Sequence, residues 1–206
     1  VFTPGDSIFL KSGDNWEGMW WLKGSGALSN PIVVGSYGGE IRPIINGYGY
    51  QSCILIYNDQ HIEINGLELY NSFSHLDSSG VVKKLTGFGG AANSWGSGKN
   101  VRFGIKVVAT TQDLKNFSFN DLYIHEIYPT PDIADNIHLG YGIKLETQSD
   151  TTSGLLNTMA DVSLKNSTIT ETGHYGFWIK SLGLNGIDSV KNNQILVENC
   201  VFEYTG

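Results

Sequence analysis

The 206-residue sequence is poor in cysteine, proline and basic residues, and it has no long apolar run. The two cysteines, Cys53 and Cys200, are not expected to pair, and two lone thiols neither demand nor exclude an oxidising compartment. No stretch approaches the roughly 18 consecutive apolar residues of a membrane-spanning helix, so we expect no membrane span. The 13 Lys and Arg residues are outnumbered by 20 Asp and Glu residues and form no basic block, so nucleic acid is not an expected partner.

Glycine, by contrast, is abundant, and short apolar stretches alternate with turn-forming residues. The chain has 26 glycines, and 40% of its residues are hydrophobic. Short strands are expected early in the chain, for example at 5–11 and 32–34, with Gly, Pro, Asn and Asp between them. This composition is typical of a single β-rich domain.

A five-residue pattern with apolar residues at its third and fifth positions recurs along the chain. Alternation of this kind is the periodicity of a β-strand. The clearest copies read FGIKV, YGIKL and YGFWI, and SCILI is a degenerate first copy. The four copies are residues 52–56, 103–107, 141–145 and 175–179.

Each copy is followed by a second shared pattern, which has a polar pair in its middle. Its copies are residues 62–69, 117–124, 162–169 and 195–202. When these copies are aligned, the first, third and last positions are apolar throughout and are expected to point inward. The polar pair, such as Asn65-Gly66 or Asn120-Asp121, contains residue types that tolerate left-handed backbone geometry. Each pair therefore predicts a tight bend between two short strands.

The paired repeats predict an all-β fold, a right-handed parallel β-helix, which is a solenoid whose coils stack into one continuous core. The alternative is a β-sandwich of similar strand content. A sandwich would not repeat one bend chemistry four times in register, and the solenoid is therefore the preferred interpretation.

The spacing between successive copies varies, and the extra residues are expected to leave the coils as long loops on one side of the rod. The predicted loops are residues 72–102, 128–140, 146–160 and 181–193. We expect residues 1–206 to form a single β-helix domain. We also expect this domain to be a portion of a longer chain, because Gly206 falls where the next repeat strand is due.

The opening residues carry a resemblance to a known superfamily. The run PGDSIFLKSGDNWEG, then GSG and NPIVVGSYGG, then RPIINGYG and HIEINGLELYNS, resembles the first coils of secreted parallel β-helix proteins of the pectate-lyase-like superfamily. That superfamily is dominated by polysaccharide lyases and glycoside hydrolases. The resemblance therefore implies a carbohydrate-active protein that is secreted or at the cell surface.

The resemblance does not extend to catalytic motifs. The Arg-x-Pro-x-x-Arg and Trp-x-Asp-His motifs of pectate lyases are absent, and so is the Asn-Thr-Asp pattern of polygalacturonases. Site residues must therefore be inferred from the repeat columns themselves.

Strand alternation predicts a cationic and aromatic outer face on the strands of the five-residue pattern, which is called the YGI pattern from here on. If Ile105 and Ile143 point inward, Lys106, Lys144 and Trp178 point outward, one above another. The glycines of the pattern would leave the backbone of this face open. Ammonium and guanidinium groups pair with sugar carboxylates or sulfates, and an aromatic ring stacks on a pyranose. The alternative is an ordinary solvated face, where lysines discourage edge pairing.

This face and its rim supply the predicted site. The predicted catalytic residues are Lys144, His174, Lys106 and His138, and the predicted substrate-binding residues are Trp178, Arg102, Lys180 and Glu146.

Two further groups are weaker candidates. His125-Glu126 beside Tyr123 could form an acid–base pair, but the register fixes no second carboxylate nearby, so ordinary surface is the preferred interpretation. Loop acids could serve a glycoside hydrolase, which needs two facing carboxyls, or a Ca²⁺ site, which needs several converging oxygens. These acids are Asp132, Asp135, Glu146 and Asp150. No cofactor is predicted beyond this candidate Ca²⁺.

The function predicted first is cleavage of an acidic polysaccharide by β-elimination. This reaction needs a cation to neutralise the uronate carboxylate and a base to remove the C5 proton. Lys144 and Lys106 are the candidates, with His174 or His138 as an alternative base, and repulsion between stacked lysines would lower the pKa of one of them. The alternatives are a glycoside hydrolase with loop Asp or Glu catalysts and a non-catalytic glycan-binding or adhesin β-helix.

Overall fold

The computed structural model describes residues 1–72, 98, 101–129, 139–147, 157–180 and 193–205. In these residues the chain forms seventeen β-strands and no helix. No helix in this part of the chain is therefore long and apolar enough to span a membrane. Every ladder between the strands is parallel, and successive strands in a sheet are three apart in chain order. The chain therefore visits three sheets in turn, which is the path of a solenoid.

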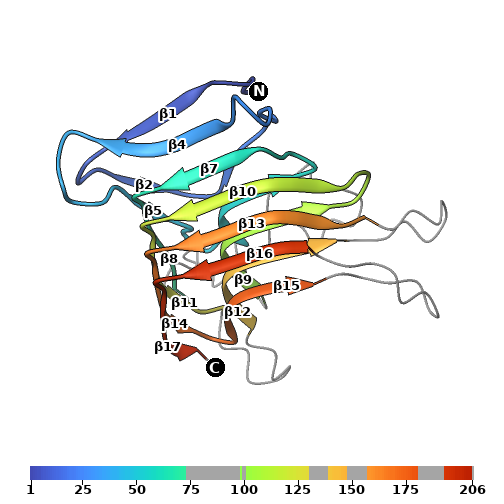
Figure 1. Cartoon of the computed structure of the whole chain (residues 1–206). Coiled ribbons are helices and arrows are strands. Elements are labelled where there is room, and N and C mark those ends of the chain that lie inside the picture. The colour runs from blue at the N-terminus through green and yellow to red at the C-terminus, as the bar shows by residue number, and fades with distance from the viewer. Residues whose placement is uncertain (73–97, 99–100, 130–138, 148–156, 181–192, 206) are drawn as a thin grey trace, which may run out of the picture.

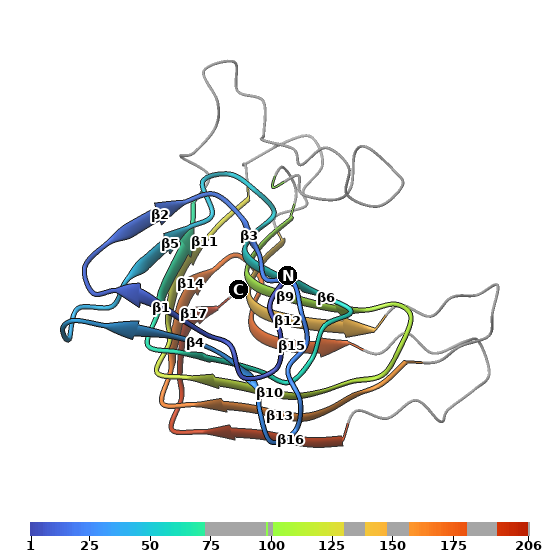
Figure 2. The ribbon, with the colours of Figure 1, turned by 90° about the horizontal axis from the view of Figure 1, so that it is seen from above.

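The first sheet holds six strands, which lie one beyond another along the rod (Figures 1 and 2). They are β1 (Ser7–Lys11), β4 (Ile32–Tyr37), β7 (Ile62–Asn65), β10 (Leu114–Asn120), β13 (Met159–Lys165) and β16 (Asn193–Glu198).

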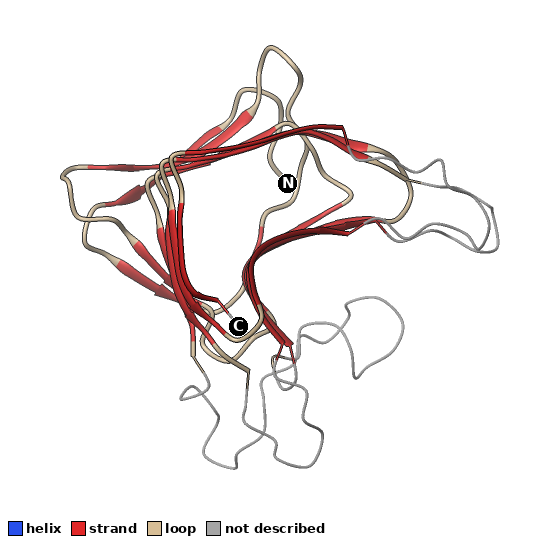
Figure 3. Ribbon diagram, turned by 60° about the horizontal axis from the view of Figure 1, so that its bottom comes forward, coloured by secondary structure: helices blue, strands red, loops and turns tan. Residues whose placement is uncertain are grey.

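The second and third sheets complete the coil, and Figure 3 shows the three sheets enclosing a common interior. The second sheet is made of β2 (Asn15–Glu17), β5 (Ile44–Asn46), β8 (Glu68–Asn71), β11 (Tyr123–Ile127), β14 (Thr168–Thr172) and β17 (Val201–Thr205). The third is made of β3 (Trp20–Trp21), β6 (Ser52–Tyr57), β9 (Val101–Ala109), β12 (Leu139–Thr147) and β15 (Tyr175–Lys180).

The observed register confirms the predicted columns. In the third sheet Ile54 pairs with Ile105, Ile105 with Ile143, and Ile143 with Phe177. The three isoleucines are fully buried, and Phe177 packs against the same core. The two cysteines are free, as expected. The parallel β-helix is thus confirmed, and its core consists of apolar columns that run through the coils.

The polar bends also have the predicted geometry. The second residue of each pair has a positive φ angle: 66° at Gly66, 54° at Asp121, 50° at Asn166 and 56° at Asn199. The amide of Asn166 donates a hydrogen bond to Oδ1 of Asn120 at 2.8 Å, and Asn199 donates to Oδ1 of Asn166 at 3.2 Å. Stacked polar side chains therefore link successive bends between the first and second sheets.

The four predicted loops fall largely outside the described residues. Strands occupy an edge of each of the four: β9 begins at Val101, β12 spans Leu139–Thr147, β13 begins at Met159 and β16 begins at Asn193. The extent of the domain and its place in a longer chain stay predictions.

Candidate functional site

The outer face of the third sheet carries the predicted lysine column. Lys144 on β12 pairs with Lys106 on β9 at one side and with Trp178 on β15 at the other. Two residues further along the strands, Glu146 pairs with Val108 on one side and with Lys180 on the other. The predicted register of these outward residues is therefore confirmed, and the column runs along the rod axis.

Lys106, Lys144 and Glu146 form a compact charged cluster on this face. The Lys144 ammonium lies 2.6 Å from Oε2 of Glu146, and the Lys106 ammonium lies 3.9 Å from Oε1. Lys106 also donates to Oε1 of Gln51 at 3.5 Å. The side chains of Lys106 and Lys144 are only 8% and 11% exposed. The alternative of an ordinary solvated face therefore does not describe these two lysines.

Aromatic rings surround the ammonium groups. The Nζ atom of Lys144 lies 4.8 Å from the ring centroid of Trp178 and 5.1 Å from that of Tyr141. The Nζ atom of Lys106 lies 4.7 Å from the ring centroid of Phe103. Cations at such distances are attracted to the ring faces, more strongly where water is excluded. The two lysines are thus held by aromatic faces as well as by one carboxylate.

The rings form a continuous layer that becomes open to solvent at β15. The ring of Tyr141 stacks on Phe103 at 5.2 Å and on Trp178 at 5.3 Å between centroids. The next ring, Tyr175, is 43% exposed. An exposed aromatic surface beside partly buried cations is a suitable platform for a sugar ring.

Burial is the largest cause that lowers the pKa of Lys106 to about 8; Glu146 acts in the opposite direction, and repulsion from Lys144 acts in the same direction as burial. The sequence predicted a lowered lysine pKa from lysine–lysine repulsion, but removal of the ammonium group from water is the larger cause. Burial, and then the charge of Glu146, raise the pKa of the Tyr141 hydroxyl to about 12. The cluster therefore combines a lysine that loses its proton readily with a tyrosine that keeps its own.

The strand alternation breaks at the glycines of the YGI pattern. Phe103 and Lys106 are three residues apart and would alternate to opposite faces, yet the Lys106 ammonium lies over the Phe103 ring. The register omits the pair formed by Gly104 and Gly142, and a Cβ atom at Gly104 would lie 2.8 Å from the core residue Ile124. These glycines face the interior. The prediction that they open the backbone of the outer face is wrong.

The same break corrects the position of Arg102. This residue was expected on the outer face, but it is fully buried and turns toward the end of β8. Its guanidinium group donates to the backbone carbonyls of Asn71, Ser72 and Gly98. Burial lowers the pKa of Arg102 to about 10. Arg102 therefore stabilises the junction between two sheets and does not join the lysine cluster.

The remaining predicted residues lie at the edge of the cluster or outside the described residues. The ring of His174 lies 5.4 Å from Tyr141 and 6.4 Å from Trp178, and the Lys180 ammonium lies 5.6 Å from the Trp178 ring. His138 and the loop acids Asp132, Asp135 and Asp150 lie outside the described residues. Gln51, Phe103 and Tyr141 were missed, although their side chains contact the lysines.

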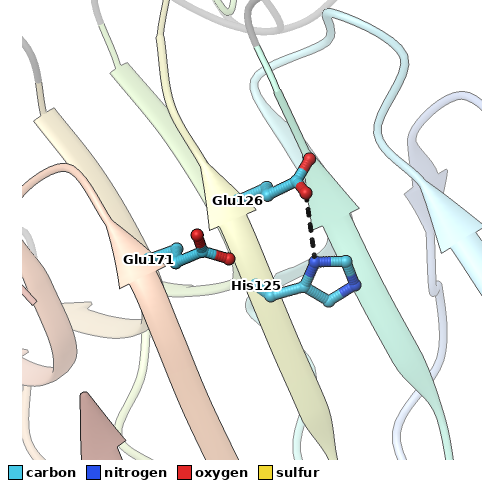
Figure 4. Close-up of side chains that lie close together, drawn as sticks. All are labelled: His125, Glu126 and Glu171. Carbon is cyan, nitrogen blue, oxygen red and sulfur yellow. Dashed lines mark ion pairs between the residues drawn. The ribbon is translucent and has the colours of Figure 1, made fainter. Parts of the chain in front are cut away.

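A second cluster occupies the outer face of the second sheet. His125 and Glu126 on β11 lie beside Glu171 on β14, and one ligand atom from each residue falls within 4.8 Å of the other two (Figure 4). The Nε2 atom of His125 lies 3.1 Å from Oε1 of Glu68 on β8. The sequence-based interpretation as ordinary surface assumed that no second carboxylate was near. The register that pairs Ile127 with Thr172 brings one there from the next coil.

Comparison with solved structures supports the fold expected from the opening residues. The GH136 lacto-N-biosidase from Eubacterium ramulus matches at 19% identity, with a TM-score of 0.68 for the selenomethionine derivative and 0.61 for the native protein. An alginate lyase from Paenibacillus sp. str. FPU-7 matches at 17% identity with a TM-score of 0.57. These matches cover 99%, 97% and 98% of this chain, respectively.

The matches show the parallel β-helix fold, which this chain shares with the lacto-N-biosidase and the alginate lyase. The chain spans 36% of the length of the lacto-N-biosidase and 61% of that of the alginate lyase. No protein-family model matches the sequence, and no curated protein matches it.

Proposed function

We propose that this chain is part of a secreted or cell-surface β-helix enzyme that cleaves an acidic polysaccharide by β-elimination. The observation that carries the proposal is the partly buried pair of Lys106 and Lys144, which share Glu146 and lie among aromatic rings. The similarity to a glycoside hydrolase and to an alginate lyase supports a carbohydrate-active protein.

The lysine pair has the two groups that elimination from a uronate requires. Lys144 supplies a positive charge that pairs with the uronate carboxylate and so acidifies the C5 proton. Lys106, whose pKa is lowered to about 8, supplies an amine that accepts this proton at Nζ at mildly alkaline pH. The electron pair of the C5–H bond then forms the C4–C5 double bond, and the glycosidic C4–O bond breaks.

The leaving oxygen needs a proton, and the hydroxyl group of Tyr141 is suited to donate it. Its hydroxyl stays protonated because its pKa is raised to about 12. The ring also stacks on Trp178, so the donor is held beside the exposed platform where the sugar would lie. His174, whose ring lies 5.4 Å from that of Tyr141, is the alternative proton carrier.

Glu146 has a positioning role in this scheme. Its two carboxylate oxygens contact different lysines, at 2.6 and 3.9 Å, which keeps the ammonium groups side by side despite their repulsion. A substrate carboxylate entering the cluster would share Lys144 with Glu146. Trp178 and Lys180 at the more open edge would bind the adjacent part of the polymer.

A panel of alginate, pectate and ulvan tests the proposal. β-Elimination leaves an unsaturated uronate at the new chain end, and its ultraviolet absorbance should rise with at least one of these substrates. New reducing ends without this absorbance would indicate a glycoside hydrolase, and binding without cleavage would indicate a non-catalytic glycan-binding rod. Either of these two results would overturn the elimination proposal.

A further inference from the structure

We infer that His125, Glu126 and Glu171 form a binding site for a divalent transition-metal cation of the Zn²⁺ type on the outer face of the second sheet. This site is separate from the lysine cluster, which lies on the third sheet, and the inference does not rest on the proposed function. The three side chains bring one ring nitrogen and two carboxylates to one place (Figure 4).

The geometry permits a common ligand. The donor atoms lie within 4.8 Å of one another, and His125 Nδ1 is 3.9 Å from Oε1 of Glu126. Figure 4 shows the Glu171 carboxylate directed from β14 toward the two residues of β11. Zinc binds nitrogen and carboxylate oxygen at about 2.0–2.2 Å. The ligand atoms around one zinc ion therefore lie closer together than the donor atoms of these three side chains do. Glu126 and Glu171 are exposed and can close that difference by side-chain rotation.

Contacts from the preceding coil and from its own strand hold the histidine ring in a suitable orientation. Glu68 on β8 lies 3.1 Å from Nε2 of His125, on the side of the ring away from Nδ1. The ring also stacks on Tyr123 at 4.5 Å and on Tyr70 at 5.5 Å between centroids. A carboxylate that accepts a hydrogen bond from one ring nitrogen fixes the tautomer and leaves the other nitrogen free to bind metal. Glu68 therefore acts as a positioning residue for His125.

The electrostatic surroundings also favour a cation. In the part of the chain that the structure describes, no Lys or Arg forms an ion pair with Glu126 or Glu171. A divalent cation would offset the repulsion between these two carboxylates.

The donor set distinguishes the class of metal. Ca²⁺ takes six to eight oxygen ligands, whereas zinc and related ions accept histidine nitrogen with carboxylate oxygen. Three protein ligands leave a fourth position for water or for an oxygen of a bound molecule. Because Glu171 belongs to the coil after that of His125 and Glu126, the ion would link two successive coils.

Calorimetric titration of the purified protein with ZnCl₂, in a buffer without chelators, tests the inference. We expect the wild type to bind one equivalent of Zn²⁺. This binding should be lost or weakened at least tenfold in His125→Ala and in Glu171→Gln. Glu68→Gln should weaken the affinity for the same Zn²⁺ ion by about 10–100-fold, because the orienting partner of a metal ligand typically contributes that much. The matched control is Glu63→Gln, which removes a carboxylate on the first sheet and should leave Zn²⁺ binding at this site unchanged.

Thermal unfolding with and without Zn²⁺ gives a second readout, since a ligand that binds only the folded state raises the melting temperature. The wild type and Glu63→Gln should gain stability from Zn²⁺, and the three site variants should gain less. Glu171 is exposed, so Glu171→Gln should fold even if His125→Ala does not. The inference is overturned if the folded wild type shows no saturable Zn²⁺ binding. It is also overturned if Glu171→Gln and His125→Ala bind Zn²⁺ as the wild type does.

Discussion

The side chain of Lys106 combines nearly complete burial with two charged neighbours of opposite sign. Its pKa is lowered to about 8, and the amine competent to accept a proton is therefore populated at mildly alkaline pH. A lysine on an open strand would remain almost fully protonated there, because its ordinary pKa is about 10.4. The base role assigned to Lys106 thus depends on its burial, which the sequence pattern did not reveal.

The first prediction concerns the pH dependence of this base. If Lys106 accepts the proton only when it is neutral, kcat/KM should rise with pH through about 8 and then level off. Lys106→Arg keeps the positive charge but cannot lose its proton, so turnover should fall by at least 100-fold. Initial rates of unsaturated-uronate formation between pH 6 and 10 measure both effects. A flat profile, or near-normal turnover in Lys106→Arg, would assign the base to another residue.

The second prediction compares two lysines of the same face. Lys144 is 11% exposed and lies in the middle of the column, whereas Lys180 lies at its more open edge. A charge-assisted contact contributes about 1.5–3 kcal/mol, so Lys144→Ala should weaken binding of an acidic oligosaccharide by at least tenfold. Lys180→Ala should have a smaller effect, because its ammonium group can be replaced by water.

Calorimetry with acidic oligosaccharides that are shown to stay uncleaved during the titration measures these affinities. Thermal unfolding of both variants checks that the lysine changes leave the fold intact. Equal affinities for the wild type and Lys144→Ala would remove the acidic-glycan site from this face.

At the scale of the elements, the repeat columns were predictable and the break in alternation was not. Apolar residues at fixed spacing, such as Ile105 and Ile143, identify the core because a parallel stack places equivalent residues on top of one another. Period-two alternation then gives the correct face for Lys106 and Lys144. The same alternation places Arg102 on the wrong face, because the strand is irregular at Gly104. Nothing in the residue types indicates on which side of that glycine the alternation changes.

The second-sheet cluster shows a different limit of sequence reasoning. His125 and Glu126 are neighbours in sequence and were recognised as candidate ligands. Glu68 and Glu171 approach them from the preceding and the following coil, and their arrival depends on the register of separate strands. An acid in the same position of successive repeats is the signal that could have been used, since Glu126 and Glu171 align once their strands are paired.

The third prediction tests the inward-facing glycines. A Cβ atom at Gly142 would lie 2.5 Å from Cγ2 of Ile169 and 2.4 Å from the carbonyl oxygen of Gly176. Because the core has no space for this methyl group, Gly142→Ala should destabilise the fold by about 1–3 kcal/mol. Urea unfolding followed by circular dichroism measures the change. An unchanged unfolding midpoint would show that Gly142 faces outward, as the simple alternation predicted.

At the scale of the whole molecule, the stacking of coils sets the spacing of everything on the outer faces. Adjacent strands of a sheet lie about 4.8 Å apart, so Lys106, Lys144 and Trp178 follow one another along the rod at about that interval. A linear polymer lying along the rod axis could therefore contact consecutive coils with successive segments. The third sheet thus provides an ordered series of contacts, with the buried cations in the middle and the more open aromatic rings at β15.

The last prediction follows from this arrangement. If the polymer runs along the column, Trp178 contacts a sugar about one coil away from the one held by Lys144. Trp178→Ala should then leave the cleavage of the shortest substrates nearly unchanged, and it should lower kcat/KM for longer ones by about five- to tenfold, since a stacked ring contributes about 1 kcal/mol or more. Kinetics on oligosaccharides of increasing length measure this dependence, with Lys180→Ala as a control that keeps the ring. A loss that is uniform over all lengths would mean that Trp178 supports the Lys144 ammonium, 4.8 Å from its ring, and does not bind the polymer.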